Sequence, residues 1–220
     1  MAASIDDDGY PIAFKTGGGD PASPLVRGQS GDSILTAEVR HVGHHQKEAV
    51  VEEGPGGPRW RLASDEGVHL KGTDLAPFPL GYFNAGLQAD LAGRVARLAK
   101  ERNIELHCFG ITLTTAYSLT GSFAQGTGQG VAEGIYIDVE IDSSASSKVV
   151  SSLIADAVAA SPALAMVTTP IENTFALYVN GRRKNPTTLP ASHARNADDP
   201  FIKYRDLPRP LATTLDQSRL

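Results

Sequence analysis

The segment "PLGYFNAGLQADLAGRVARLAKE", residues 79–101, limits the possible folds of this chain more than any other stretch. Large apolar side chains recur on one side of a 3.6-residue helical wheel, at Leu80, Phe83, Leu87, Leu91, Val95 and Leu98. Alanines cover much of the remaining wheel, and Pro79 is tolerated in a first helical turn because its missing N–H would be unpaired there. The pattern therefore predicts a long helix that is buried on more than one side.

The elements around this helix predict an α+β fold with antiparallel sheets. Alternation and β-branched or aromatic composition predict strands at residues 33–42, 48–53, 59–64, 105–123, 135–142 and 174–183. A Gly- and Gln-rich loop is expected at 124–134, and a second helix from a cap at Ser143 or Ser144 to Pro162. Strands and helices are segregated, unlike the strict alternation of a doubly wound parallel sheet.

Size and composition narrow the classes of function. The chain has 220 residues, 41% of them hydrophobic, and a net charge of −5, which predicts one domain and makes a nucleic-acid partner unexpected. No run is apolar enough for a membrane span, and the first residues do not resemble a signal peptide, so we expect a cytoplasmic protein. We expect a flexible N-terminal arm at 1–30, a domain at 31–183 and a C-terminal extension at 184–220.

Two motifs resemble the OsmC/Ohr-like family. The stretch "LASDEGVHLKGTDLAPFPLGYFNAGLQAD" is similar to the family's acidic turn, its two prolines and the start of its central helix. The stretch "AASPALAMV" stands where the family has its second cysteine motif, and the resemblance covers roughly residues 33–182. It implies an OsmC-like fold, with curved antiparallel sheets around two central helices in an intertwined homodimer, and sites at the subunit interface.

The chain departs from the family at the residues that carry its peroxidase chemistry. With Pro77 and Pro79 placed on the family's prolines, Asp90 stands at the position of the first cysteine and Ser161 at that of the second. A thiol peroxidase needs a sulfur nucleophile and a second thiol to resolve it, which Asp and Ser cannot supply. The family's arginine after the first strand has no counterpart, and His44 or His45 stands in that region instead.

A carboxylate and an imidazole in an apolar pocket form a workable proton-transfer pair. We therefore expect a non-redox enzyme, of hydrolase, lyase or isomerase type, that acts on a small apolar or aromatic substrate at the dimer interface. The candidate catalytic residues are Asp90, His44 and His45. The candidate substrate-binding residues are Tyr82, Asn84, Gln88 and Ser161. No cofactor and no metal site is expected.

Simpler interpretations remain open for each of these residues. Asp90 could form only a helix ion pair with Arg94, the histidines could be solvated turn residues, and Ser161 could be a helix terminus. The protein would then be a non-catalytic OsmC-like protein that binds a small molecule. A second alternative is a peroxide or organic hydroperoxide reductase that uses Cys108, the single cysteine.

Overall fold

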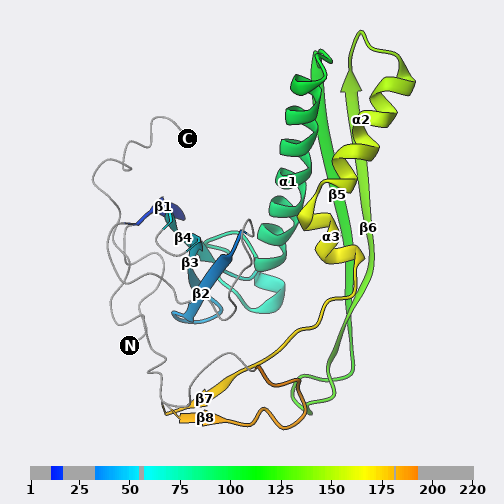
Figure 1. The fold of residues 1–220 in the computed structure, drawn as a ribbon. Coiled ribbons are helices and arrows are strands. Elements are labelled where there is room, and N and C mark those ends of the chain that lie inside the picture. Colours follow the sequence, from blue (N-terminus) through cyan, green and yellow to red (C-terminus); the bar gives the residue numbers. More distant parts are fainter. Residues whose placement is uncertain (1–10, 17–32, 55–56, 181, 193–220) are drawn as a thin grey trace. The chain divides into compact units, whose positions relative to one another are not determined.

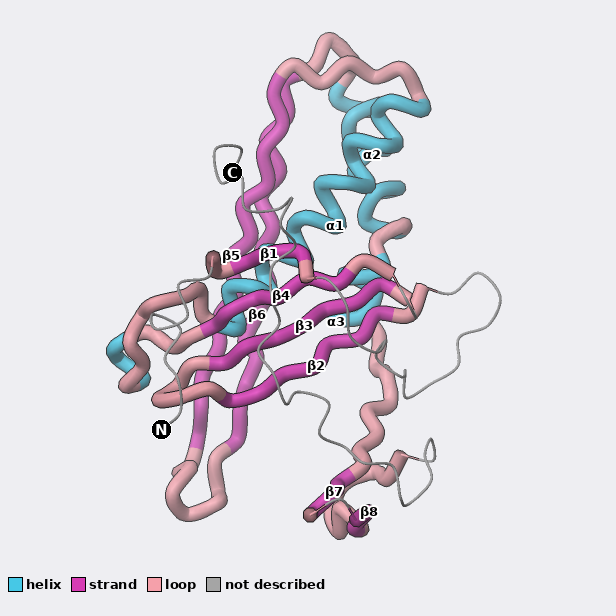
Figure 2. Tube along the Cα trace, turned by 90° about the vertical axis from the view of Figure 1, so that its left-hand side faces the viewer, coloured by secondary structure: helices cyan, strands magenta, loops and turns pink. Residues whose placement is uncertain are grey.

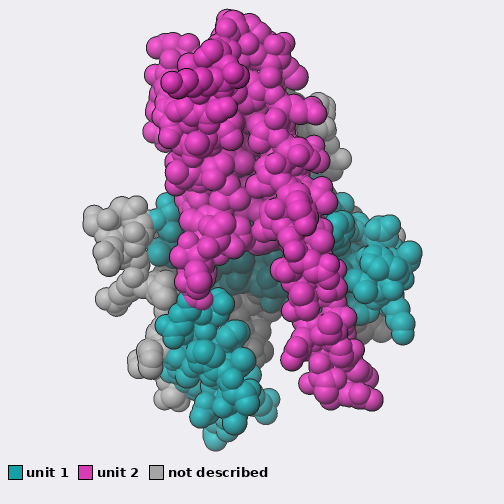
Figure 3. All heavy atoms as spheres, turned by 90° about the vertical axis from the view of Figure 1, so that its right-hand side faces the viewer, with its two compact units in different colours: residues 1–79, 172–220 teal, residues 80–171 magenta. Residues whose placement is uncertain are grey.

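The computed structural model describes residues 11–16, 33–54, 57–180 and 182–192 (Figure 1). The chain divides into two compact units, coloured separately in Figure 3. Residues 1–79 and 172–220 form what we call the sheet unit, and residues 80–171 form the helix unit. The sequence led us to expect one domain, and the boundaries predicted at residues 30 and 183 stay a prediction. Most of the predicted terminal arms lies outside the described residues.

The helix unit consists of one long hairpin and a layer of helices. Its elements are α1 (Pro79–Glu101), β5 (Cys108–Thr120), β6 (Gln129–Asp142), α2 (Ser147–Ala159) and α3 (Pro162–Thr168). Strands β5 and β6 pair antiparallel along their whole length, with an irregularity between Ala116 and Tyr117. Figure 2 shows the hairpin as one layer and the helices as the other.

One apolar cluster holds the two layers of the helix unit together. Its buried members are Leu87, Leu91, Val95, Ala99, Leu153, Ala157 and Leu164. Partly buried side chains of the hairpin, among them Phe109, Ile111 and Ile137, pack against this cluster. The alternation of β5 and β6 thus gives the hairpin an apolar inner face, which lies on the helices.

The predicted apolar stripe of α1 is only partly buried. Leu80 and Phe83, in the first turns, are 45% and 37% exposed, whereas Leu87 and Leu91 are buried. The alanines on the rest of the wheel, which the sequence predicted to be buried as well, are only partly so: Ala99 is buried and Ala92 half-buried, whereas Ala85, Ala89 and Ala96 are exposed. The physical reason is that the helix unit provides one packing layer for α1, not two.

The sheet unit contains a four-stranded antiparallel sheet in the order β1-β4-β3-β2 (Figure 2). Its strands are β1 (Ala13–Lys15), β2 (Leu35–His41), β3 (Lys47–Glu53) and β4 (Arg59–Ser64). A short hairpin of β7 (Leu177–Val179) and β8 (Arg182–Lys184) belongs to the same unit. The sequence pattern did not indicate β1, which falls inside the predicted arm.

Charged side chains occupy the buried face of the four-stranded sheet. Glu48 is fully buried between two arginines, with Arg61 Nε 2.8 Å from one carboxylate oxygen and Arg40 Nε 2.8 Å from the other. Arg61 also lies over the ring of Phe14, 5.3 Å from its centroid. Leu35 and Val39, on the other face, are 75% and 61% exposed. Burial of these charges is tolerated because each has a close partner of opposite sign.

Most predicted elements are confirmed, and three details were wrong. Every pairing between named strands is antiparallel, which confirms the α+β prediction. Strand β6 begins at Gln129 and takes in half of the predicted glycine-rich loop. The N-cap position of the second helix is Ser146, not Ser143 or Ser144, and its side chain makes no capping hydrogen bond. Pro162 begins a separate helix. The last predicted strand is a hairpin, because Asn180 takes a left-handed conformation between β7 and β8.

Among the described helices, none is by itself both long and apolar enough to cross a membrane. Helices α2 and α3, which meet at a 70° bend, satisfy that test of length and composition only when taken together.

Candidate functional site

Asp90 lies in the middle of α1, between the buried residues Leu87 and Leu91, and both of its carboxylate oxygens accept hydrogen bonds. Oδ1 accepts from Arg94 one turn later, at 3.1 Å from Nη2 and 3.3 Å from Nε. Oδ2 accepts from Ser161 Oγ at 2.6 Å and from the backbone N–H of Ala163 at 3.5 Å. The carboxylate therefore links α1 to the start of α3.

Ser161 is the N-cap of α3, whereas the simpler interpretation of the sequence made it the terminus of the second helix. Its side chain is 1% exposed, and its Oγ accepts from the backbone N–H of Leu164 at 3.1 Å while it donates to Asp90. Pro162 occupies the first turn of α3, where its missing N–H costs nothing. The hydroxyl group of Ser161 thus both donates and accepts a hydrogen bond. It holds the negative charge of Asp90 at the N-terminus of α3, where the helix dipole stabilises a negative charge.

The environment of Asp90 keeps the carboxylate ionised. Burial alone would raise the pKa of Asp90, but hydrogen bonds from Ser161, Arg94 and Ala163, together with the charge of Arg94, outweigh it and lower the pKa below the ordinary value. An aspartate with a lowered pKa has no proton to donate at neutral pH. As a base it would also be weaker than a free aspartate.

Asn84 lies six residues before Asp90 and faces the hairpin. Its Nδ2 donates to Thr115 Oγ1 on β5 at 2.8 Å. Its Oδ1 is buried and accepts no hydrogen bond from the described residues. Tyr82 and Gln88, the other substrate-binding candidates on this helix, are both half-buried. The structure thus brings Asp90 together with Ser161, and it places Asn84 at a separate polar contact with β5.

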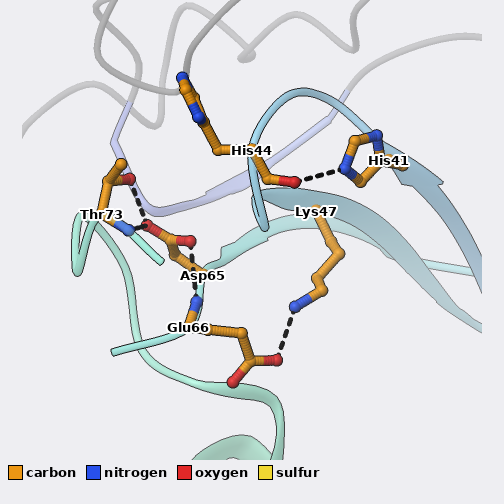
Figure 4. Close-up of polar contacts among 6 residues, drawn as sticks. All are labelled: His41, His44, Lys47, Asp65, Glu66 and Thr73. Atoms are coloured by element: carbon orange, nitrogen blue, oxygen red, sulfur yellow. Dashed lines mark hydrogen bonds and ion pairs between the residues drawn. The ribbon is translucent and has the colours of Figure 1, made fainter. Parts of the chain in front are cut away.

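His44 and His45 lie on the turn between β2 and β3, in the sheet unit, and both are exposed. His44 has a left-handed backbone, with φ of 47°, and its carbonyl oxygen lies 2.7 Å from His41 Nε2 (Figure 4). This contact requires a proton on Nε2 of His41. Because these histidines belong to a different unit from Asp90, a pairing of Asp90 with an imidazole stays a prediction.

A second carboxylate, which we did not single out from the sequence, organises the loop between β4 and α1. Asp65 is fully buried and accepts from Thr73 Oγ1 at 2.5 Å and from the backbone N–H groups of Glu66, Thr73 and Leu75. Figure 4 shows this contact beside the ion pair of Lys47 with Glu66, 2.7 Å apart. In the sequence, the acidic turn "SDE" was the feature from which a role for Asp65 could have been predicted.

The hydrogen bonds to Asp65 also determine its ionisation. Burial alone would raise the pKa of Asp65, but the hydrogen bonds from Thr73, Leu75 and Glu66 hold it below the ordinary value. Gln46, fully buried, donates in turn to Thr73 Oγ1 at 2.8 Å. Asp65 is thus a structural anchor for the loop that leads into α1.

Comparisons with known proteins match this chain at the level of structure. No family model matches the sequence, and no curated protein matches it. An OsmC-like hydroperoxide resistance protein from Jannaschia sp. CCS1 matches 69% of this chain and 96% of its own, with 19% identity and a TM-score of 0.46. The match with an OsmC-like protein from Mycoplasma pneumoniae covers 64% of this chain and 90% of that protein, with 16% identity and a TM-score of 0.47. The match with the organic hydroperoxide resistance protein OhrB of Bacillus subtilis covers 64% of this chain and 93% of that protein, with 18% identity and a TM-score of 0.37.

The chain is similar to OsmC-like proteins. On the registration that the sequence motifs imply, Asp90 and Ser161 stand at the two cysteine positions of OsmC-like proteins. The structure shows that these two side chains contact each other directly. Cys108, the single cysteine of the chain, lies exposed at the start of β5, and no second thiol is available to it.

Proposed function

We propose that this chain forms a homodimer that binds a small, mainly apolar molecule without transforming it. The single observation that carries the proposal is the state of Asp90, whose two oxygens are held by Ser161, Arg94 and Ala163. An ionised carboxylate with these partners acts as a structural link. A cytoplasmic location is part of the proposal, and the single cysteine supports it.

The geometry supports binding better than acid–base catalysis for two reasons. A general acid needs a pKa near neutrality, usually raised by burial, whereas the pKa of Asp90 is lowered. A serine nucleophile needs a base that takes its proton, whereas Ser161 is 1% exposed and caps α3. The acid–base enzyme predicted from the sequence would need His44 or His45 to reach Asp90, and it is the alternative that the experiment below addresses.

Exposed apolar surfaces in both units support the homodimer. On α1 the small residues Gly86, Ala89, Gly93 and Ala96 face outward, and a Cβ added at Gly86 or Gly93 would meet nothing within 4 Å. Such a surface lets a second helix approach closely. In the sheet unit, Leu35, Val39 and Trp60 expose 75%, 61% and 44% of their surface. The strand register puts these three side chains on one face of the sheet, and exposed apolar side chains that gather on one face often mark an interaction surface.

Native mass spectrometry of the freshly purified protein tests the proposal. We expect a dimer that carries a small neutral molecule, and we expect the molecule extracted after a day at room temperature to have an unchanged mass and an unchanged chromatographic retention time, since isomers differ only in the latter. Asp90→Asn should carry the same molecule. If the mass or the retention time changes with time in the wild type and not in Asp90→Asn, the protein is an acid–base enzyme and the proposal fails.

The same preparation tests the peroxidase alternative. With tert-butyl hydroperoxide and dithiothreitol as probes, we expect consumption of the peroxide at the rate of the protein-free control. Dithiothreitol would itself reduce a sulfenic acid formed at Cys108, so the assay does not depend on a second thiol in the chain. We expect Cys108→Ser to behave like the wild type. Peroxide consumption that is lost in Cys108→Ser would establish the reductase instead.

A further inference from the structure

Strand β1 and the residues next to it lie along the edge of β4 (Figure 2). Three residues of β1 pair antiparallel with three residues of β4: Ala13 with Leu62, Phe14 with Arg61 and Lys15 with Trp60. Backbone hydrogen bonds continue at both ends, from the N–H of Ala63 to the carbonyl oxygen of Ile12 at 2.8 Å and from the N–H of Thr16 to that of Arg59 at 2.9 Å. An extended peptide that binds to a sheet edge makes the same backbone contacts.

One arginine of β4 holds this segment on the covered face of the sheet. Phe14 is 2% exposed, and the guanidinium group of Arg61 lies 5.3 Å from the centroid of its ring. Nη1 of Arg61 also donates to the carbonyl oxygen of Pro11 at 2.9 Å. Arg61 is itself fixed by Glu48, whose carboxylate oxygen is 2.8 Å from Nε. The edge of β4 therefore offers a site for one aromatic side chain and one backbone carbonyl group.

The same segment fits the open face of the sheet less well. Because partners in a strand pair point to the same face, Ala13 lies beside Leu62 and Lys15 beside Trp60, on the side away from Phe14. An alanine is too small to cover its neighbour, and the charged end of a lysine stays in water. Trp60 is accordingly 44% exposed. The segment is thus a good ligand for one face of the edge and a poor ligand for the other.

This difference between the two faces indicates what can replace the segment. A segment on the same chain has the advantage of a high effective concentration, which is set by the tether. The same residues on a second copy would make identical contacts without that advantage. A peptide of another protein overcomes it only with additional contacts, and the open face at Leu62 and Trp60 is where such contacts remain to be made.

We propose that the edge of β4 is a peptide-docking site, which residues 11–16 occupy as an intrachain competitor. The partner is an extended segment of another protein, with an aromatic side chain at the position of Phe14 and large apolar side chains at the positions of Ala13 and Lys15. It adds to β4 as a strand, with the aromatic ring against Arg61 and the apolar side chains over the open face. This inference goes beyond the proposed function and does not depend on a bound small molecule.

Titration of the full chain with three labelled peptides tests the site by fluorescence anisotropy. The first peptide has the sequence of residues 9–17, the second carries Ala13→Val and Lys15→Val, and the third carries Phe14→Ala in addition to these two changes. We expect the second peptide to bind at least tenfold more tightly than either of the others. The first peptide competes with a tethered segment that makes identical contacts, and the third has lost its anchor.

Trp60, the single tryptophan of the chain, reports where the peptide binds. None of the three peptides contains tryptophan, so the tryptophan emission comes from Trp60 alone. The unlabelled second peptide should shift this emission to shorter wavelength, because its valine side chains cover the exposed part of Trp60. The third peptide should leave the emission unchanged.

Variants of the full chain show whether residues 11–16 compete for the site. Phe14→Ala in the chain removes the anchor of the intrachain segment, so the first peptide should bind this variant at least tenfold more tightly than it binds the wild type. Ile12→Ala is the matched control, because Ile12 belongs to the same segment but is 39% exposed, and it should leave the affinity unchanged. If the Phe14→Ala chain does not fold, the titrations of the wild type decide the question.

Three results with the wild type would overturn the proposal: no binding of the second peptide, equal binding of the second and third peptides, or binding without a shift of the Trp60 emission. Equal binding of the first and second peptides would show that the open face does not select the partner, which also overturns it. An unchanged affinity of the first peptide for a folded Phe14→Ala chain would mean that residues 11–16 are not a competitor.

Discussion

At the scale of single residues, the main finding is a hydrogen bond between two residues that are 71 positions apart. Asp90 and Ser161 were singled out from the sequence as polar residues at positions where a thiol pair stands in a related pattern. Their contact at 2.6 Å gives the carboxylate a structural partner in addition to Arg94. Spacing on the helix predicted Arg94 as a partner, because residues four apart face each other. Local spacing does not predict Ser161 as a partner, and the available signal was the resemblance that puts both residues at the positions of a thiol pair.

The link between Asp90 and Ser161 should contribute measurably to stability. Ser161→Ala removes both the N-cap of α3 and the donor to Asp90, so we expect a loss of about 1–2 kcal/mol in the free energy of unfolding. Arg94→Ala should lose less than about 0.5 kcal/mol, because its side chain is 36% exposed and the ion pair is screened by solvent. Urea denaturation of the two variants provides the comparison. An Arg94→Ala variant less stable than Ser161→Ala would show that we have ranked these contacts wrongly.

At the scale of elements, α1 has one buried side and one open side. The periodicity predicted the buried stripe correctly at Leu87, Leu91 and Val95, since large apolar residues at that spacing must pack against something. The sequence pattern also predicted burial of the alanines on the rest of the wheel, of which Ala85, Ala89 and Ala96 are exposed in this chain. Small residues permit close packing, but they do not reveal whether the partner helix belongs to the same chain.

Gly93→Leu should separate the stability of α1 from the formation of the dimer. Leucine has a higher helix propensity than glycine, and a Cβ at this position meets nothing within 4 Å, so the folded chain should be as stable as the wild type or more stable. The larger side chain should keep the second helix away and raise the dimer dissociation constant at least tenfold, as measured by analytical ultracentrifugation. Gly93→Ala is the control, because it also raises the helix propensity but adds only a methyl group, and it should have little effect on the dimer. A dimer unaffected by Gly93→Leu would place the subunit contact elsewhere.

At the scale of the whole molecule, each of the two units contains one ionised aspartate that connects separate segments of that unit. Asp65 fixes the loop before α1 in the sheet unit, and Asp90 connects α1 with α3 in the helix unit. The pKa of each group is lowered in the folded state, mainly because hydrogen bonds to the carboxylate outweigh the effect of burial. Both groups therefore link the stability of the fold to pH in the same direction.

This linkage predicts loss of stability in acid. A carboxylate with a lowered folded-state pKa stabilises the fold above its unfolded-state pKa, which is about 4, and the contribution is lost as pH falls below that value through the folded-state pKa. We expect the melting temperature to be flat from pH 7 to 5 and to fall below pH 4. Asp65→Asn should be less stable than the wild type at pH 7, and the difference should shrink as the pH decreases. A constant difference from pH 7 to 3 would mean that the charge of Asp65 contributes nothing.

The sequence by itself determined most elements of this protein, because hydrophobic periodicity, turn residues and the span of each segment are local properties. It predicted the antiparallel α+β order and the start of α1 at Pro79, but not β1 or the separate helix α3. Only the tertiary structure decided which polar residues meet. Ser161 and Thr115, the partners of Asp90 and Asn84, come from segments distant in the chain, and burial decides which of their hydrogen bonds must be made.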